Sequence, residues 1–148
     1  MITDTLIKLF KRDLNKLISE LDLYKDESNL WKQEGLVSNS AGNLCLHLVG
    51  NLNHFIGATL GNTGYVRQRD LEFTNKNVPV SDMKNQVKET ITMVGKTLSK
   101  LTEADLQAEY RRNPFEDYMT TEYFLTHLAL HLAYHLGQIN YHRRLLDT

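Results

Sequence analysis

The chain has 148 residues, of which 41% are hydrophobic and 24% charged, proportions typical of a globular protein with one domain spanning residues 1–148. Its formal net charge of −1 predicts no basic surface, so we expect no nucleic-acid partner. No apolar run reaches the roughly 18 residues that span a bilayer, and the first residues lack the charge order of a signal peptide. With Cys45 as the only cysteine, no disulfide framework is possible. These features predict a cytoplasmic protein without a membrane partner.

The first half of the chain predicts two amphipathic helices. Apolar residues recur at steps of three and four over residues 2–24, which is the spacing of one helix face. A second helix is expected over residues 40–60, with Ser40 as the N-cap and Gly61 after its end. Residues 61–79 are polar and rich in turn-forming residues, so they predict a loop long enough to cross a bundle.

Two further helices are expected in the second half. The third begins after Pro79, with Ser81 or Asp82 as its cap, and ends near residue 101. The fourth begins at Thr120 or Thr121 and ends near residue 146, and residues 110–118 between them are irregular and aromatic. Four such helices predict an all-α fold, a four-helix bundle with a long connection between its second and third helices.

The fourth helix carries a run of histidines. His127, His131 and His135 lie four residues apart, a spacing that places them on one helix face. Two imidazoles at this spacing can bind one metal ion at about 2.0–2.1 Å from each nitrogen. A third ligand must come from another helix, and the second helix offers His47 and His54, which are about 10.5 Å apart along its axis.

Spacing leaves the ligand pair open, because both His127 with His131 and His131 with His135 fit. The pattern differs from H-E-x-x-H, in which a glutamate between two zinc ligands acts as general base. The alternative is a hydrogen-bonded histidine core without metal. His142, next to Arg143 and Arg144 in the last helical turn, is interpreted as a cation that interacts with the helix dipole.

Other polar residues are candidates for contact with a substrate or a ligand imidazole. Arg67, Arg69, Asp70 and Glu72 form a dense charge cluster in the long loop. If this loop folds over the metal site, the arginines would bind an anionic group of the substrate. Asp70 or Glu72 would serve as a base or as the hydrogen-bond partner of a metal ligand.

The second and fourth helices add candidates of their own. Asn51 and Gln138 each lie about one turn from a histidine and are candidates to orient its ring. Tyr134 is a candidate proton donor, although boundary packing is its default interpretation, and Gly137 suggests close approach of another helix.

Three strings of residues resemble a known family. They are L-H-L-V-G-N-L around His47, H-L-A-Y-H-L-G-Q-I from His131 to Ile139, and R-Q-R-D-L-E-F from Arg67 to Phe73. Together they are similar to the DinB-like superfamily of metalloenzymes, in a subgroup whose function is unknown. The resemblance covers essentially the whole chain.

This resemblance implies a four-helix bundle that binds a divalent ion, most often nickel or zinc, through His47, His131 and His135. It also implies a homodimer, because related proteins are often dimers, and some relatives use low-molecular-weight thiols as cosubstrates. The resulting hypothesis is a metal-dependent transferase or hydrolase with a small, thiol-bearing substrate. The alternative is a non-catalytic, metal-stabilised dimeric bundle that binds a small molecule or a protein partner.

Overall fold

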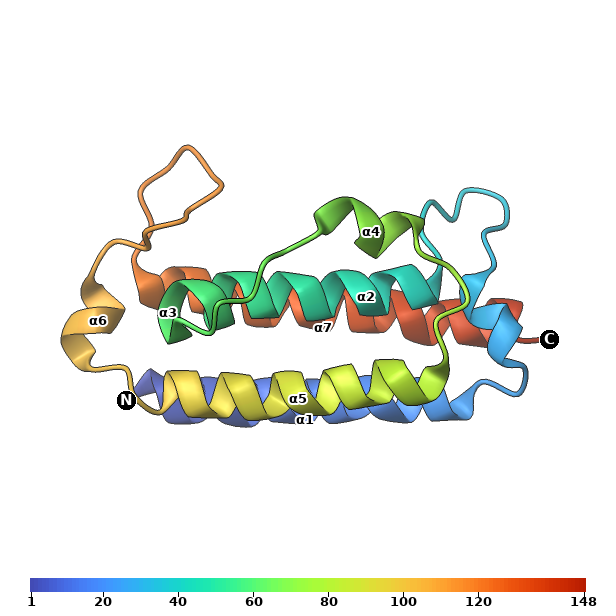
Figure 1. Ribbon diagram of the computed structural model, residues 1–148, viewed down its shortest axis with the longest axis horizontal. Helices are drawn as coiled ribbons and strands as arrows, with labels where there is room; N and C mark the ends of the chain where they lie inside the picture. Colours follow the sequence, from blue (N-terminus) through green and yellow to red (C-terminus); the bar gives the residue numbers. More distant parts are fainter.

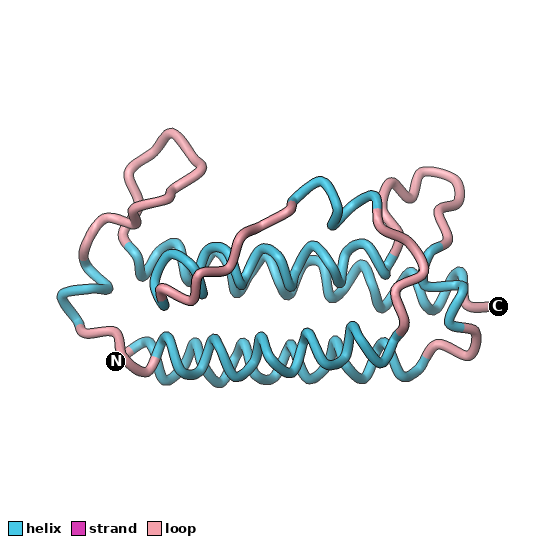
Figure 2. The backbone as a smooth tube through the Cα atoms, viewed as in Figure 1, coloured by secondary structure: helices cyan, strands magenta, loops and turns pink.

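The computed structural model describes residues 1–148 and confirms the all-α prediction (Figures 1 and 2). The four long helices are α1 (Ile2–Leu23), α2 (Ala41–Leu52), α5 (Val80–Leu98) and α7 (Thr121–Leu146). The shorter elements are the 3-10 helix η1 (Glu27–Trp31), the π-helical turn η2 (Asn53–Ala58), α3 (Thr59–Gly61), α4 (Arg69–Thr74) and α6 (Glu103–Gln107). No helix is long and apolar enough to cross a membrane.

The long helices form two packed layers (Figure 1). Helix α1 packs against α5 and α7, and α2 packs against the same two helices, so α1 and α2 lie diagonally across the bundle. Helices α1 and α7 run in one direction and α2 and α5 in the other (Figure 1). The predicted long connection between the second and third helices therefore crosses the length of the bundle and joins two parallel helices.

This connection is more ordered than the loop expected over residues 61–79, because it contains α4 packed on α2. The side-chain amide of Asn43 in α2 donates hydrogen bonds to the backbone carbonyls of Glu72 and Asn75, at 3.0 and 2.8 Å. Carbonyls at a helix end need such partners, so α2 stabilises the end of α4. Composition alone could not predict this contact across 29 residues of sequence.

The helix starts follow the predicted caps with one exception, and the second predicted helix ends at Gly61, with Asn62 and not Gly61 after its end. Ser40 accepts a hydrogen bond from the amide of Asn43, and Thr120 accepts one from the amide of Tyr123. For α5 the prediction of Ser81 or Asp82 as cap is wrong, because the helix begins at Val80 with Pro79 in the cap position. Pro79 has no N–H to satisfy and its ring restricts φ, which suits a helix start.

The core is one cluster of 26 buried hydrophobic residues. It includes most of the α1 stripe that the sequence predicted, namely Leu6, Phe10, Leu14, Leu17 and Leu21. Near the start of α7, Tyr110 stacks on Phe124 with ring centroids 4.2 Å apart and donates a hydrogen bond to the carbonyl of Phe55 at 2.6 Å. The irregular aromatic segment is thereby anchored to the core at its first residue.

The interpretation of His142 as a cation that interacts with the helix dipole is wrong. His142 is buried, with Nε2 2.9 Å from the carbonyl oxygen of Lys32 and Nδ1 2.7 Å from the hydroxyl of Tyr24. A carbonyl only accepts, so Nε2 carries the proton and Nδ1 accepts from Tyr24. Burial lowers the pKa of His142, so the neutral ring ties α7 to the end of α1.

Candidate metal centre

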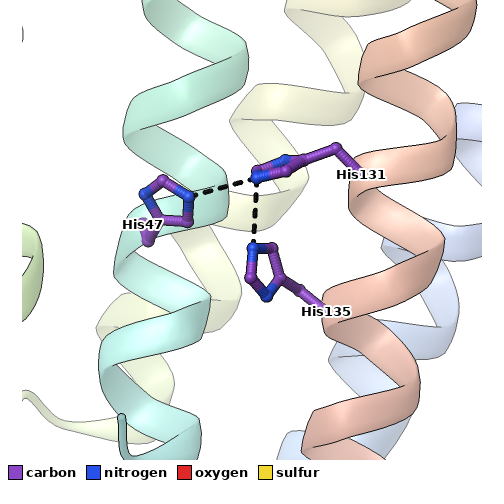
Figure 3. Close-up of side chains that lie close together, drawn as sticks. All are labelled: His47, His131 and His135. Atoms are coloured by element: carbon purple, nitrogen blue, oxygen red, sulfur yellow. Dashed lines mark hydrogen bonds between the residues drawn. The ribbon is translucent and has the colours of Figure 1, made fainter. Parts of the chain in front are cut away.

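Three histidines from two helices converge on one point (Figure 3). Nε2 of His131 lies 3.3 Å from Nε2 of His47 and 3.1 Å from Nε2 of His135. His47 comes from α2 and the other two from adjacent turns of α7. Of the two pairs that spacing left open, the structure thus brings His131 and His135 together with His47, and their ligand atoms lie within 4.8 Å of one another.

Acceptors on the outer side of two rings determine which nitrogens face the centre. Nδ1 of His47 lies 3.0 Å from Oε1 of Glu72, and Nδ1 of His135 lies 2.7 Å from Oε1 of Gln138. Because carboxylate and amide oxygens accept, both Nδ1 atoms carry the proton and both Nε2 lone pairs point inward. The contact of 3.4 Å between Nη2 of Arg67 and Nδ1 of His47 then joins two donors and is not a hydrogen bond.

His131 lies at the middle of the cluster and is kept neutral. Burial, followed by the neighbouring His135 and His47, lowers the pKa of His131 to about 3. Burial also lowers the pKa of His135, against the opposing hydrogen bond from Gln138. Nδ1 of His131 is buried without a hydrogen-bond partner. Neutral imidazoles are the form that binds metal ions.

The donor set fits a divalent transition metal. Two nitrogens about 2.05 Å from a tetrahedral zinc ion are separated by about 3.3 Å, which matches the two short separations around His131. In the absence of a cation, the ring proton of His131 can lie on Nε2 and be donated to Nε2 of His47 or His135, and a bound ion would take the place of this proton. Three histidines with outer-shell acceptors are also the ligand pattern of catalytic zinc sites.

An ion pair in the crossing connection supports His47. Arg67 donates to both oxygens of Glu72, through Nε at 2.8 Å and Nη2 at 2.9 Å. Burial opposes ionisation of Glu72, but the hydrogen bonds from His47 and Arg67 outweigh it and hold the pKa of this carboxyl below its usual range. Glu72 is therefore an anion held between an arginine and a candidate ligand. The sequence analysis placed Glu72 among the candidates for a base or for the partner of a ligand, and the structure places it against His47.

Of the other residues in the predicted charge cluster, Arg67 lies beside the histidines, and Arg69 and Asp70 lie away from them. Arg67 is bonded to Glu72 and its guanidinium lies 5.7 Å from the ring centre of Phe55, so it is not free to grip a substrate in this structure. Arg69 and Asp70 are exposed, and Arg69 lies over the ring of Phe73. Neither contacts the histidines.

Among the residues expected to orient an imidazole, Gln138 makes the contact and Asn51 does not. Asn51 is buried, but its Oδ1 has no hydrogen-bond partner. Tyr134 is 67% exposed, with its ring centre 5.5 Å from that of His135 and no hydrogen bond to it. His127 lies outside the cluster, with its ring centre 6.2 Å from that of His131.

Two glycines differ from what the sequence analysis suggested: Gly137 lacks the expected close contact, and Gly50 has one that was not expected. A Cβ on Gly137 would meet no atom within 4 Å, so Gly137 does not serve a close approach inside the bundle. A Cβ on Gly50 would overlap the carboxylate of Glu72, and this position was missed. The sequence did indicate this position. A glycine inside a helix, here one turn after His47, costs about 1 kcal/mol relative to alanine, so its presence indicates that a neighbouring group packs against it.

These neutral histidines predict acid sensitivity of the metal-free protein. The unfolded chain binds protons at histidine near pH 6.5, whereas folded His131 does so only at about pH 3, so stability is full above pH 6.5 and falls as the pH is lowered. Between pH 6.5 and 4.5 we expect a loss of about 1–2 kcal/mol from His131, after discounting for its contact with solvent. Urea unfolding in the presence of a chelator measures it. A His131→Gln variant should show a flatter profile, and equal slopes for both proteins would contradict the assignment.

Comparison with known families assigns the chain to one of them. The family model of the DinB superfamily matches residues 9–139, a range that contains all three converging histidines. The chain therefore belongs to the DinB superfamily, as the resemblance of its three strings predicted. A search of curated proteins found no match to the sequence.

Proposed function

We propose that His47, His131 and His135 bind one divalent transition-metal ion, nickel or zinc, and that the protein is a cytoplasmic, single-domain, metal-dependent transferase or hydrolase. Its substrate is a small molecule, with thiol-bearing compounds as the first class to test. The observation that carries the proposal is the convergence of three Nε2 atoms. Nε2 of His131 lies 3.3 Å from Nε2 of His47 and 3.1 Å from Nε2 of His135. Two of the rings are held by acceptors on their outer nitrogens.

Three protein ligands leave at least one coordination position for solvent or substrate. When bound there, such an ion supplies Lewis acidity that polarises a substrate group or lowers the pKa of a water or thiol. Glu72 and Gln138 keep the rings of His47 and His135 in the orientation that presents Nε2. Burial keeps His131 neutral and available as a ligand.

A groove of about 1250 Å³ gives a small molecule access to this region. It follows the second half of α7, and its lining includes His135, Gln138 and Tyr134. Lys16 and Arg144 line the same groove, whose two acids, Asp13 and Glu20, are already paired with Arg12 and Arg143, so the groove favours an anionic ligand. A substrate in the groove would lie beside His135, one of the three proposed ligands.

Elemental analysis of the purified, tag-free protein tests the metal site. We expect about one nickel or zinc ion per chain in the wild type and none in His131→Ala. His127→Ala is the matched control, because it removes a histidine one turn earlier on the same helix, outside the cluster. Absence of metal from the wild type after incubation with nickel and zinc would contradict the proposal, and so would equal loss in both variants.

One observation favours the second candidate, a non-catalytic, metal-stabilised bundle. Glu72 is the carboxylate that contacts the cluster, and both of its oxygens are already bonded to Arg67 or His47. No carboxylate at the cluster is thus free to act as a general base. Transfer and hydrolysis assays with the metal-loaded protein separate the two candidates: turnover that His131→Ala abolishes supports the enzyme, and its absence across thiol and ester substrates supports the bundle.

A further inference from the structure

The groove beside His135 gathers exposed apolar side chains. It is lined by 22 of the 148 residues, yet it holds five of the fifteen large hydrophobic residues that are exposed. We call these five the apolar wall, and they are Leu36, Val37, Tyr134, Tyr141 and Leu145. A single exposed leucine or tyrosine needs no explanation, but several of them along one groove are typical of a binding site.

Part of the apolar wall comes from the turn between η1 and α2. Leu36 is fully exposed and follows Gly35, whose φ of +56° lies in the left-handed region. The turn is closed from within, because the side-chain amide of Gln33 donates to the carbonyl of Ser38 at 2.7 Å. Leu36 therefore projects from a closed turn without packing on the rest of the chain. A ligand in the groove would give this side chain an apolar surface to pack on.

Gly137 lies in the same groove, in the middle of α7. Glycine is unfavourable inside a helix, and packing within the chain does not require it, because a Cβ there would meet no atom within 4 Å. The space in front of Gly137 thus belongs to the groove. A ligand that lies against the helix backbone would explain why this position lacks a side chain.

Unbalanced positive charge lies next to the apolar wall. The two acids that line the groove, Asp13 and Glu20, each accept a hydrogen bond from an arginine, at 2.9 and 2.7 Å. The charges of Lys16 and Arg144 are therefore not balanced by these acids. The guanidinium of Arg144 lies 4.9 Å from the ring centre of Tyr141, so cationic and apolar groups are adjacent.

From these observations we infer that the groove binds an amphipathic anion, a molecule with an apolar chain or ring and a carboxylate or similar anionic group. The apolar part packs on the apolar wall, and the anionic group pairs with Lys16 or Arg144. The groove volume of about 1250 Å³ exceeds the roughly 300–1,000 Å³ of typical small-molecule sites, so such a ligand fits.

This inference narrows the substrate class of the proposed function and rests on that function in one respect. His135 also lines the groove, so a molecule bound there would lie beside the proposed metal centre. Among small substrates, with or without a thiol, the groove would select acids that have an apolar body. Binding of the acid itself depends on the groove and not on the metal.

Isothermal titration calorimetry with straight-chain carboxylates tests the ligand class. Hexanoate, octanoate and decanoate differ only in apolar length, and each added methylene should tighten binding about two- to fourfold. Octan-1-ol has the chain of octanoate without its charge and should bind about two- to fivefold more weakly, as expected for the loss of an exposed ion pair. Octyltrimethylammonium, with the opposite charge, should bind more weakly still.

Matched variants separate the charge from the apolar wall. Lys16→Gln should weaken octanoate about two- to fivefold and leave octan-1-ol unchanged, whereas Lys11→Gln, on the same helix outside the groove, should change neither. Leu145→Ala should weaken both ligands about threefold. Leu130→Ala is its control, because Leu130 is 67% exposed, against 68% for Leu145, and does not line the groove.

A steric variant tests where the ligand lies. Gly137→Leu should abolish detectable binding of octanoate and octan-1-ol without lowering the stability of the protein, because its side chain meets only the open groove. Gly95→Leu in α5 is the control, since a Cβ there also meets no atom within 4 Å and Gly95 lies outside the groove. Binding that survives Gly137→Leu would overturn the inference.

Each titration is performed on the protein as purified and after treatment with a chelator, with metal content measured on both samples. Octanoate should bind in both, and binding that is lost together with the metal would overturn the inference. No gain in affinity with chain length would also overturn it, as would equal octanoate affinity of Lys16→Gln and Lys11→Gln. A protein that binds octanoate but takes up no nickel or zinc would support the groove and contradict the metal site, so the two failures are distinguishable.

Sedimentation velocity on the same samples tests whether something else covers the apolar wall. Leu145→Ala should leave the mass of the protein unchanged while it weakens octanoate binding. A change of mass together with an unchanged octanoate affinity would show that another copy of the chain packs on the wall, and it would overturn the inference.

Discussion

Replacing Glu72 by alanine should lower the free energy of unfolding of the metal-free protein by about 3–5 kcal/mol, because it leaves a charged group without its partner in a mostly buried position. The Arg67 side chain is 11% exposed and donates two hydrogen bonds to Glu72. The same substitution removes the acceptor that fixes the ring of His47. Loss of such an outer partner weakens metal affinity by about 10–100-fold. Urea unfolding and competitive metal titration measure the two effects.

Asp70→Ala provides the matched control, because Asp70 is an exposed acid in the same short helix. It should change stability by no more than about 0.5 kcal/mol and leave metal affinity unaltered. Glu72→Gln keeps the shape of the side chain without its charge, so it should fall between Glu72→Ala and the wild type. If Glu72→Ala and Asp70→Ala behave alike, the ion pair in the crossing connection does not stabilise the protein.

Gly50→Ala should destabilise the protein by about 2 kcal/mol, although alanine is the better helix former by about 1 kcal/mol. The added Cβ would lie 2.5 Å from the carboxyl carbon of Glu72. A flexible side-chain end can normally move aside cheaply, but Glu72 accepts three hydrogen bonds from Arg67 and His47 and cannot move without breaking them. Urea unfolding of the metal-free protein measures the change.

The same substitution should change sign when Glu72 is absent. In a Glu72→Ala background nothing opposes the new methyl group, so Gly50→Ala should become neutral or stabilising. Gly95→Ala in α5 is the control, because a Cβ there meets no atom within 4 Å and should stabilise both backgrounds. Additive effects of Gly50→Ala and Glu72→Ala would show that the two positions do not interact.

The long helices could be predicted because their signals are local. Apolar residues at steps of three and four, Ser40 and Thr120 at helix starts and Pro79 before α5 each act within a few residues of sequence. The crossing connection could be predicted only as a loop, because α4 is stabilised by Asn43, which lies on another helix. Its order is a tertiary effect that composition does not encode.

The histidine geometry was predicted only in part. Spacing on α7 predicted pairs of histidines, but the choice between them came from a family resemblance, since helical periodicity places His127, His131 and His135 on one face. For His142 the local sequence was misleading. Its position in the last turn suggested a cation, whereas contacts with Tyr24 and Lys32, more than 100 residues earlier, make it a buried neutral ring. Whether a side chain near a helix end is buried depends on which segment packs over it.

The diagonal placement of α1 and α2, and of α5 and α7, has a consequence for the folding rate. Helices that follow each other directly in an up-and-down bundle can dock as hairpins soon after they form. Here α1 packs on α5 and α7 instead, and α2 meets α5 only after the crossing connection has spanned the bundle. Each docking step must therefore close a long stretch of chain, which raises the entropic barrier before packing compensates for it. We expect this bundle to fold more slowly than helical proteins of its size with hairpin connections, and α7, whose contacts reach back to α1, to dock last.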